Sequence, residues 1–145
     1  IFMYLLYHIL TLVSTCSNFL NAQGGATSVP NFENTRQYRV RLSADGTKIE
    51  LLDSPHLVPI PLAAFDKVEE CLNRGIHKPG CAHKRLGDGA LDNQTIMYHV
   101  GRDIYERNDG AYIHDNSCYI FAILDAAGCI DRQKGFISKR PYSGV

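Results

Sequence analysis

The chain has 145 residues, of which 45% are hydrophobic, and its fifteen basic and fifteen acidic residues leave no net charge when histidine is neutral. This length favours one domain and argues against two. A neutral chain is not built as a general polyanion binder, because non-specific affinity for nucleic acid requires an excess of Lys and Arg, although local basic patches remain open.

The N-terminus carries no charged residue before Glu33. The hydrophobic run Met3–Val13 is followed by small and polar residues up to Ala22. The run is too short to cross a membrane, which takes about 20 apolar residues. Its length is typical of the hydrophobic region of a signal peptide, with Ala22 at the cleavage point, and the alternative is a buried N-terminal helix.

We therefore predict a signal peptide over residues 1–22 and a secreted protein that has no membrane segment after cleavage. Residues 23–36 are rich in Gly, Ser and Asn and are predicted to form a flexible N-terminus of the mature chain. Residues 37–145 are predicted to form the folded domain.

Four cysteines remain after cleavage, and an even number in a short secreted chain predicts two disulfides with three possible pairings. We favour crossed bridges that join a helix and the loop after it to a sheet, without deciding the pairing. Asn93 begins a glycosylation sequon, whose use the sequence leaves open. The four cysteines are Cys71, Cys81, Cys118 and Cys129.

A hairpin is the first element expected in the domain. Apolar and polar residues alternate over Tyr38–Leu42 and again over Lys48–Leu52. Asp45-Gly46 between them is a strong hairpin signal, because this pair accepts the backbone conformation of a tight turn.

One helix is expected next. Apolar residues recur at helical spacing from Leu62 through Phe65 and Val68 to Leu72. Pro61 suits the start of the helix, and Gly75 suits the position just after its end.

The rest of the domain is predicted to be a long loop followed by short strands. The run from Tyr119 to Leu124 is apolar at every position, as in a central strand covered on both faces. We therefore predict an α+β fold: an N-terminal β-hairpin and one α-helix packed on an antiparallel β-meander. The expected strands are 95–100, 111–114, 118–124, 128–132 and 136–139.

The loop after the helix is a candidate binding segment. His77, Cys81 and His83 lack the paired spacing of a zinc site, and we predict neither a metal nor a cofactor. The loop could hold a phosphate backbone, although a solvated surface loop has the same appearance in sequence. The RNA-binding candidates are His77, Lys78, His83, Lys84 and Arg85.

A second cluster could support catalysis if its members share one face of the sheet. RNA hydrolysis requires a base, an acid and a cation beside the phosphate, and His99, Glu106, Arg107 and His114 include all three types. Only residues of matching parity on neighbouring strands converge. The alternative is a scatter of half-exposed strand residues.

The chain resembles the small fungal guanyl-specific ribonucleases, and more closely the ribonuclease-like secreted effectors of powdery mildew fungi. A tyrosine-led strand at Tyr38 precedes one helix that ends at Gly75, and Met97–Tyr112 reads as strand, Gly turn, Tyr, Asp-Gly and Tyr. Cys118–Ile130 is similar to the family's central strand, turn and next strand, and Phe136 stands where the family often has an aromatic residue. The resemblance implies a ribonuclease T1-like fold.

The departures from the family concern its catalytic groups. Cys118 stands where the enzymes have a catalytic Arg, residues 125–140 contain no His, and the catalytic Glu aligns near Tyr98 or His99. A Tyr-x-Cys motif usual in the effectors is replaced by Tyr-Arg-Val at Tyr38. The resemblance therefore implies an effector that keeps the fold without the usual catalytic site.

Three hypotheses follow. The first is a secreted fungal virulence effector with a non-catalytic ribonuclease-like fold that acts inside or beside a host cell by binding a host protein or RNA. The second is an active ribonuclease that uses His99 and His114 as base and acid, with Arg102 or Arg107 near the phosphate. The third is a small disulfide-stapled extracellular binding module.

Overall fold

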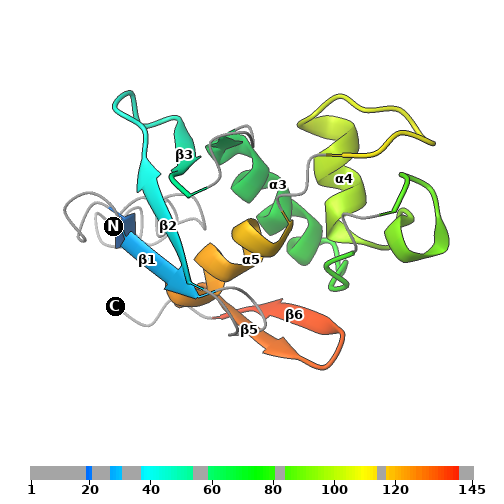
Figure 1. Cartoon of the computed structure of the whole chain (residues 1–145). Helices are drawn as coiled ribbons and strands as arrows, with labels where there is room; N and C mark the ends of the chain where they lie inside the picture. The colour runs from blue at the N-terminus through cyan, green and yellow to red at the C-terminus, as the bar shows by residue number, and fades with distance from the viewer. Residues whose placement is uncertain are drawn as a thin grey trace, which may run out of the picture.

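The computed structural model describes residues 19–20, 27–30, 37–53, 59–80, 84–113 and 117–140. These residues form a mixed α+β fold with two antiparallel sheets, which confirms the predicted class. In Figure 1 the larger sheet lies on one side, α3 and α5 lie in the middle, α4 lies beyond α3, and the β5–β6 hairpin lies below.

The larger sheet has the strand order β1-β2-β3-β4. Its strands are β1 (Thr27–Pro30), β2 (Gln37–Leu42), β3 (Lys48–Leu51) and β4 (Ile60–Pro61). The predicted β2–β3 hairpin is confirmed, and the alternation that predicted it places Val40 and Ile49 in the core. Strand β1 lies inside the segment predicted to be flexible, where its pairing with β2 satisfies its backbone groups.

The turn of this hairpin is built around Asp45. Its carboxylate accepts hydrogen bonds from the Ser43 hydroxyl and from the hydroxyl and the backbone N–H of Thr47. The Ser43 and Thr47 bonds lower the pKa of Asp45 to about 2, because they stabilise the charged carboxylate. The Asp-Gly pair therefore specifies the turn by side-chain bonding as well as by the freedom of Gly.

Helix α3 (Leu62–Asn73) is the predicted helix, and it ends as the sequence indicates. Gly75 has φ +83°, its N–H donates to Leu72, and the next N–H, of Ile76, donates to the Cys71 carbonyl. These two bonds form a Schellman motif, which requires a residue at positive φ and therefore favours Gly.

The prediction of a strand over 95–100 is wrong, because this stretch begins helix α4 (Ile96–Asp103). Its buried residues are Ile96, Met97, Val100 and Gly101, which share one helical face. A tertiary contact supports the start of the helix: the N–H groups of Ile96 and Met97 donate to the carbonyls of Lys78 and Pro79. The buried residues thus recur with the period of a helix and not with the alternation of a strand.

The prediction of a central strand over 118–124 is also wrong. Ser117–Ala126 form helix α5, in which every residue from Tyr119 to Leu124 is buried. A continuous apolar run carries no period, so it suits a buried helix as well as a buried strand. Helix α5 ends in a second Schellman motif, with Gly128 at φ +75° and the Cys129 N–H bonded to the Leu124 carbonyl.

These two helices replace the predicted meander. No strand forms over 111–113 in the described part of the chain, and His114 lies outside the described residues. The last two predicted strands are confirmed as β5 (Ile130–Gln133) and β6 (Phe136–Lys139), which pair as a separate hairpin. A short 3-10 helix, η1, covers Gly89–Leu91. The described residues thus contain three α-helices where one was expected in this domain.

The core joins all of these elements in one cluster. Phe65 of α3, Met97 of α4 and Ile120 of α5 are fully buried in it, together with Ile49 of β3 and Ile130 of β5. An interior of this kind is stabilised by the removal of apolar surface from water. Among the described helices, none has the length and apolar character of a membrane span.

The core also includes a residue of the predicted signal peptide. Phe19 and Leu20 are helical, and Leu20 is only 2% exposed within the core cluster. Residues 1–18 and 21–26 lie outside the described residues, and so does the proposed cleavage point after Ala22. Cleavage there would remove the Leu20 side chain from the core.

The burial of Leu20 gives a stability prediction. In the full chain, Leu20→Ala is expected to lower the free energy of unfolding by about 2–5 kcal/mol, because it leaves a cavity in the core. Chemical denaturation of both proteins measures the change. The control is Tyr112→Ala, at a residue that is 54% exposed, which should change stability by about 0.5 kcal/mol or less. An equally small effect at Leu20 would show that this residue is dispensable to the folded domain.

Candidate functional site

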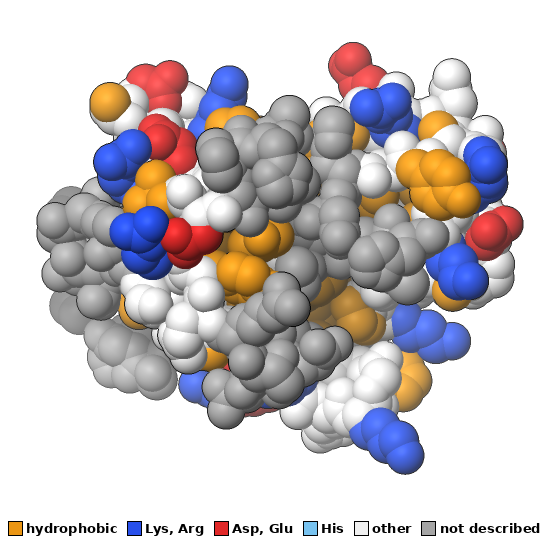
Figure 2. All heavy atoms as spheres, viewed as in Figure 1, with side chains coloured by type: hydrophobic (Ala, Val, Ile, Leu, Met, Phe, Trp, Pro, Cys, Tyr) orange, Lys and Arg blue, Asp and Glu red, His pale blue; other side chains and the backbone are white. Residues whose placement is uncertain are grey.

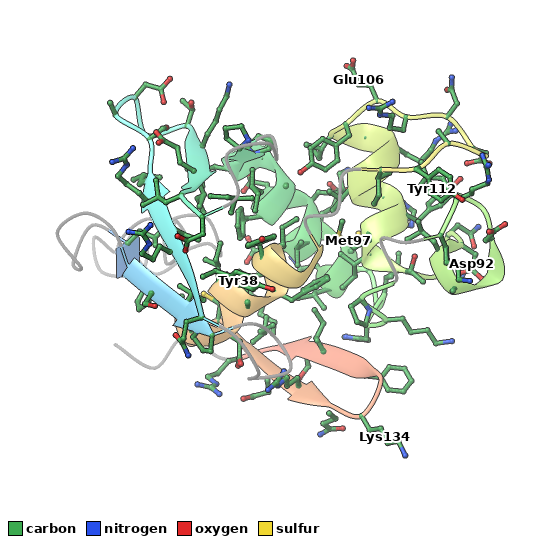
Figure 3. All side chains as sticks on the ribbon, in the orientation of Figure 1. Tyr38, Asp92, Met97, Glu106, Tyr112 and Lys134 are labelled. Atoms are coloured by element: carbon green, nitrogen blue, oxygen red, sulfur yellow. The ribbon has the colours of Figure 1, made fainter. Side chains whose placement is uncertain are left out.

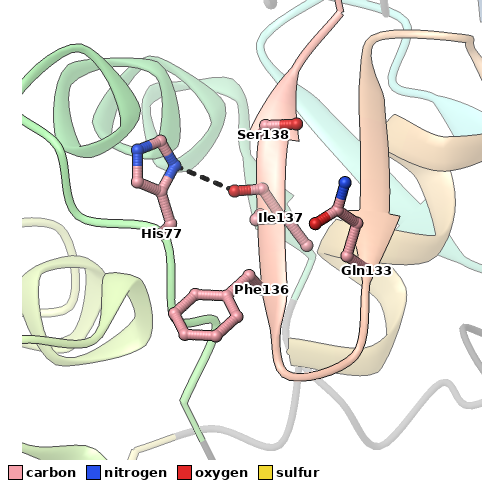
Figure 4. Close-up of a pocket in the computed structure, with 5 residues that line it drawn as sticks. All are labelled: His77, Gln133, Phe136, Ile137 and Ser138. Atoms are coloured by element: carbon pink, nitrogen blue, oxygen red, sulfur yellow. Dashed lines mark hydrogen bonds between the residues drawn. The ribbon is translucent and has the colours of Figure 1, made fainter.

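An open pocket lies between the segment after α3 and the β5–β6 hairpin. Its volume is about 300 Å³, and it is lined by His77, Gln133, Phe136, Ile137 and Ser138. Figure 4 shows the His77 and Phe136 rings on the same side of β6. The size is at the lower end of the range for small-molecule sites.

Two hydrogen bonds attach His77 to the middle of β6. The Ile137 N–H donates to the His77 carbonyl at 2.9 Å, and the His77 ring Nδ1 lies 2.9 Å from the Ile137 carbonyl oxygen. A carbonyl oxygen can only accept, so Nδ1 is the donor. In the neutral ring, Nε2 then carries the lone pair and can accept a hydrogen bond from a ligand.

The elements around the pocket are held in place from two further sides. The Lys78 and Pro79 carbonyls accept the first N–H groups of α4, which fixes the segment after His77. Lys139 of β6 forms an ion pair with Glu69 of α3 at 2.6 Å, and the Glu69 side chain is only 13% exposed. The pocket is therefore built on α3, α4 and β6 together, which gives its side chains a rigid support.

The chemistry of the pocket suits binding better than acid–base catalysis. His77 is the one titratable side chain among its five lining residues. General acid–base hydrolysis requires a base and an acid on the two sides of the reacting group. The remaining groups are an aromatic ring, an aliphatic side chain, an amide and a hydroxyl, which can hold a ligand but do not move protons at neutral pH.

The segment that forms the β5–β6 hairpin is rich in cations although the whole chain is neutral. Residues 130–140 contain four cations against the single acid Asp131. Three of these cations form ion pairs with acids: Arg132 with Asp125, Lys139 with Glu69, and Arg140 with Asp131. Figure 2 shows blue Lys or Arg side chains at the lower right of the molecule, one at the end of the hairpin and one above it. Within the described part of the chain, neither Lys134 nor the exposed Lys78 forms an ion pair with an acid.

The predicted RNA-binding loop is divided by the structure. His77 lines the pocket and Lys78 is its neighbour, whereas Arg85 lies against another loop. The Arg85 guanidinium donates to the Gly110 carbonyl at 2.9 Å and stacks 4.6 Å from the centre of the Tyr112 ring. Lys84 is exposed, and His83 lies outside the described residues.

The predicted catalytic cluster does not have the strand geometry that was required of it. His99 is on helix α4, where its ring Nε2 donates to the Asn93 carbonyl at 2.8 Å. Glu106 and Arg107 are exposed in the loop after α4, and His114 lies outside the described residues. In Figure 3, Glu106 lies at the end of the molecule opposite Lys134, far from the pocket.

The cation proposed to assist this cluster is engaged by an acid. Arg102 lies 3.3 Å from an Asp109 oxygen that also accepts a hydrogen bond from the Tyr98 hydroxyl at 2.9 Å. The bond to Asp109 raises the pKa of Tyr98, because it stabilises the protonated phenol. The contacts of Asp109 with Tyr98 and Arg102 therefore attach the loop after α4 to the helix.

The structure describes the side chains of two of the four cysteines that are predicted to form disulfides. Cys71 and Cys129 are both buried, and no disulfide joins them. Burial raises the pKa of the Cys71 thiol to about 11, which keeps it protonated and unreactive. Cys71 is a free thiol, which contradicts the predicted pair of disulfides because that pair requires all four cysteines. Cys81 and the Cys118 side chain lie outside the described residues. Among the described residues, no three His, Cys, Asp or Glu side chains are grouped so that they could hold a metal.

Sequence reasoning missed most of the pocket. Gln133 and Ser138 were not singled out, and Phe136 was noted only as a family feature. One signal was available: Phe136 follows a Lys-Gly turn in a basic hairpin, and the buried Ile137 beside it places Phe136 on the outer face of a two-stranded sheet. An exposed large aromatic residue in such a place indicates a contact surface.

Comparison of the chain with protein-family models, with curated proteins and with solved structures finds no match. The resemblance to ribonuclease-like effectors thus depends on the residues of the sequence alone.

The attachment of His77 to β6 gives a further prediction. His77→Ala is expected to lower the free energy of unfolding by about 0.5–1.5 kcal/mol, the usual net contribution of one hydrogen bond. It should also speed amide hydrogen exchange in β6 more than in α3, because the hairpin loses one of its anchors.

The matched control is His77→Asn, since an Asn amide nitrogen can take the position of the ring Nδ1 as donor. The asparagine variant should keep most of the stability. Equal behaviour of the Ala and Asn variants would contradict the assigned role of this bond.

Proposed function

We propose that this protein is a secreted, non-catalytic effector on a ribonuclease-like scaffold, and that it acts by binding RNA. The observation that carries the proposal is a pair of lysines, Lys78 and Lys134, that adjoin residues of the His77–Phe136 pocket in the chain and have no acidic partner among the described residues. Cations without acidic partners beside one pocket attract a polyanion to that place, whereas the rest of the chain offers no excess of positive charge.

Binding without cleavage is supported by the residues near the pocket. A single imidazole stands there, and its Nδ1 is occupied by a backbone carbonyl. The absence of His from residues 125–140, next to and within the hairpin, points the same way. The effector role and secretion are supported by the family resemblance and by the apolar N-terminus, and they belong to the proposal.

RNA is favoured over a host protein because the cations Lys78 and Lys134 beside the pocket lack acidic partners among the described residues. Successive phosphates of an RNA backbone can each pair with one such lysine, whereas the centre of a protein–protein interface is generally depleted of Lys. Lys84 remains a candidate for a further phosphate contact, whereas the Arg85 guanidinium is engaged by the Gly110 carbonyl and the Tyr112 ring.

The test is the salt dependence of binding to a fluorescently labelled single-stranded RNA, measured by anisotropy. Lys134→Gln should weaken binding and make the slope of log K against log salt less steep by about 0.7, the value for one lost phosphate contact on a single strand. The control is Lys48→Gln, at an exposed lysine of β3, which should keep the slope of the unaltered protein.

The same samples are then run on a denaturing gel, where the RNA should remain intact. Cleavage that is lost on His99→Ala or His114→Ala would replace this proposal by the ribonuclease hypothesis. Absence of RNA binding by the unaltered protein would refute it, and a host protein would then be the partner to seek.

A further inference from the structure

We propose that the His77–Phe136 pocket holds one unpaired base of a single-stranded RNA, stacked on the Phe136 ring. This inference rests on the proposed function and specifies how its ligand is recognised. The protein would then recognise unpaired nucleotides, in addition to attracting the phosphate backbone.

The first support is the position of Phe136. Its side chain is 49% exposed, while Ile137 beside it is 2% exposed and fills the core. The ring therefore stands on the outer face of β6, beside the His77 ring (Figure 4). A flat aromatic surface open to water is what a base stacks on, and every base offers a face for this contact.

The second support is the set of polar groups at the rim. The Gln133 amide can both donate and accept, Ser138 offers a hydroxyl, and His77 Nε2 can accept. Within the described residues, the side chains of Gln133 and Ser138 make no hydrogen bond. These groups are therefore available to the edge of a base that lies on the Phe136 ring.

The third support is the placement of charge relative to the ring. Lys78 follows His77 directly in the chain, and Lys134 lies at the tip of the β5–β6 hairpin, two residues before Phe136 (Figure 3). Each of these lysines is thus next to a pocket residue in the chain, and neither has an acidic partner among the described residues, so both are available to the phosphates that flank a base. In a duplex the faces of the bases are already stacked, so the pocket should discriminate against double-stranded RNA.

The decisive variant is Phe136→Trp in the full chain, because the natural sequence contains no tryptophan. The new indole reports on its own surroundings, and stacking of a base on it quenches its fluorescence. The matched control is Tyr112→Trp, at the other exposed large aromatic residue among those described, outside the pocket. A 12-nucleotide single-stranded RNA should quench the first variant and leave the second unchanged.

Affinity provides an independent readout. Phe136→Ala should weaken binding of the same RNA by about 5- to 150-fold, the range for loss of one base-stacking aromatic. Tyr112→Ala should change it less than twofold. Circular dichroism and thermal melting of each variant establish that the fold is kept, as the exposure of both side chains predicts.

The outcomes separate this inference from the proposed function. If the unaltered protein binds RNA but Phe136→Trp is not quenched and Phe136→Ala binds normally, the base pocket is wrong and backbone binding stands. Equal affinity for the same RNA annealed to its complement also overturns the pocket. If the unaltered protein binds no RNA, the proposed function fails together with this inference.

Discussion

The site depends on the attachment of β6 to the segment that follows α3. The paired hydrogen bonds between His77 and Ile137 act at one point, and the ion pair of Lys139 with Glu69 acts two residues further along the strand. A two-stranded hairpin is marginally stable alone, so these contacts give β5–β6 a fixed place. That place puts the exposed Phe136 beside the His77 ring and creates the pocket.

The two Schellman motifs explain how much of the fold could be predicted. Gly75 follows a run with clear helical spacing, so its role as a helix end was recognised. Gly128 ends α5 in the same way, but it follows an apolar run without a period, for which the sequence predicts a strand. Local signals give the turn chemistry, whereas the choice between a buried helix and a buried strand is decided by tertiary packing.

The candidate site was predicted only in its N-terminal half. His77 and Lys78 were selected because charge and imidazole are visible in a sequence. Gln133 and Ser138 were not, since their role arises from a contact between segments about 60 residues apart. The predicted catalytic cluster failed for the related reason that convergence of His99 and His114 required strands, and His99 is on helix α4.

The central claim is that RNA is bound at the His77–Phe136 pocket, and crosslinking tests it most directly. A single-stranded RNA containing 4-thiouridine is irradiated with the full chain, which is then digested with trypsin and analysed by mass spectrometry. We expect the crosslink in the peptide from Gly135 to Lys139, which contains Phe136. Crosslinks confined to peptides of residues 84–113 would contradict the account, because they would place the RNA on the loops around α4 and away from β6.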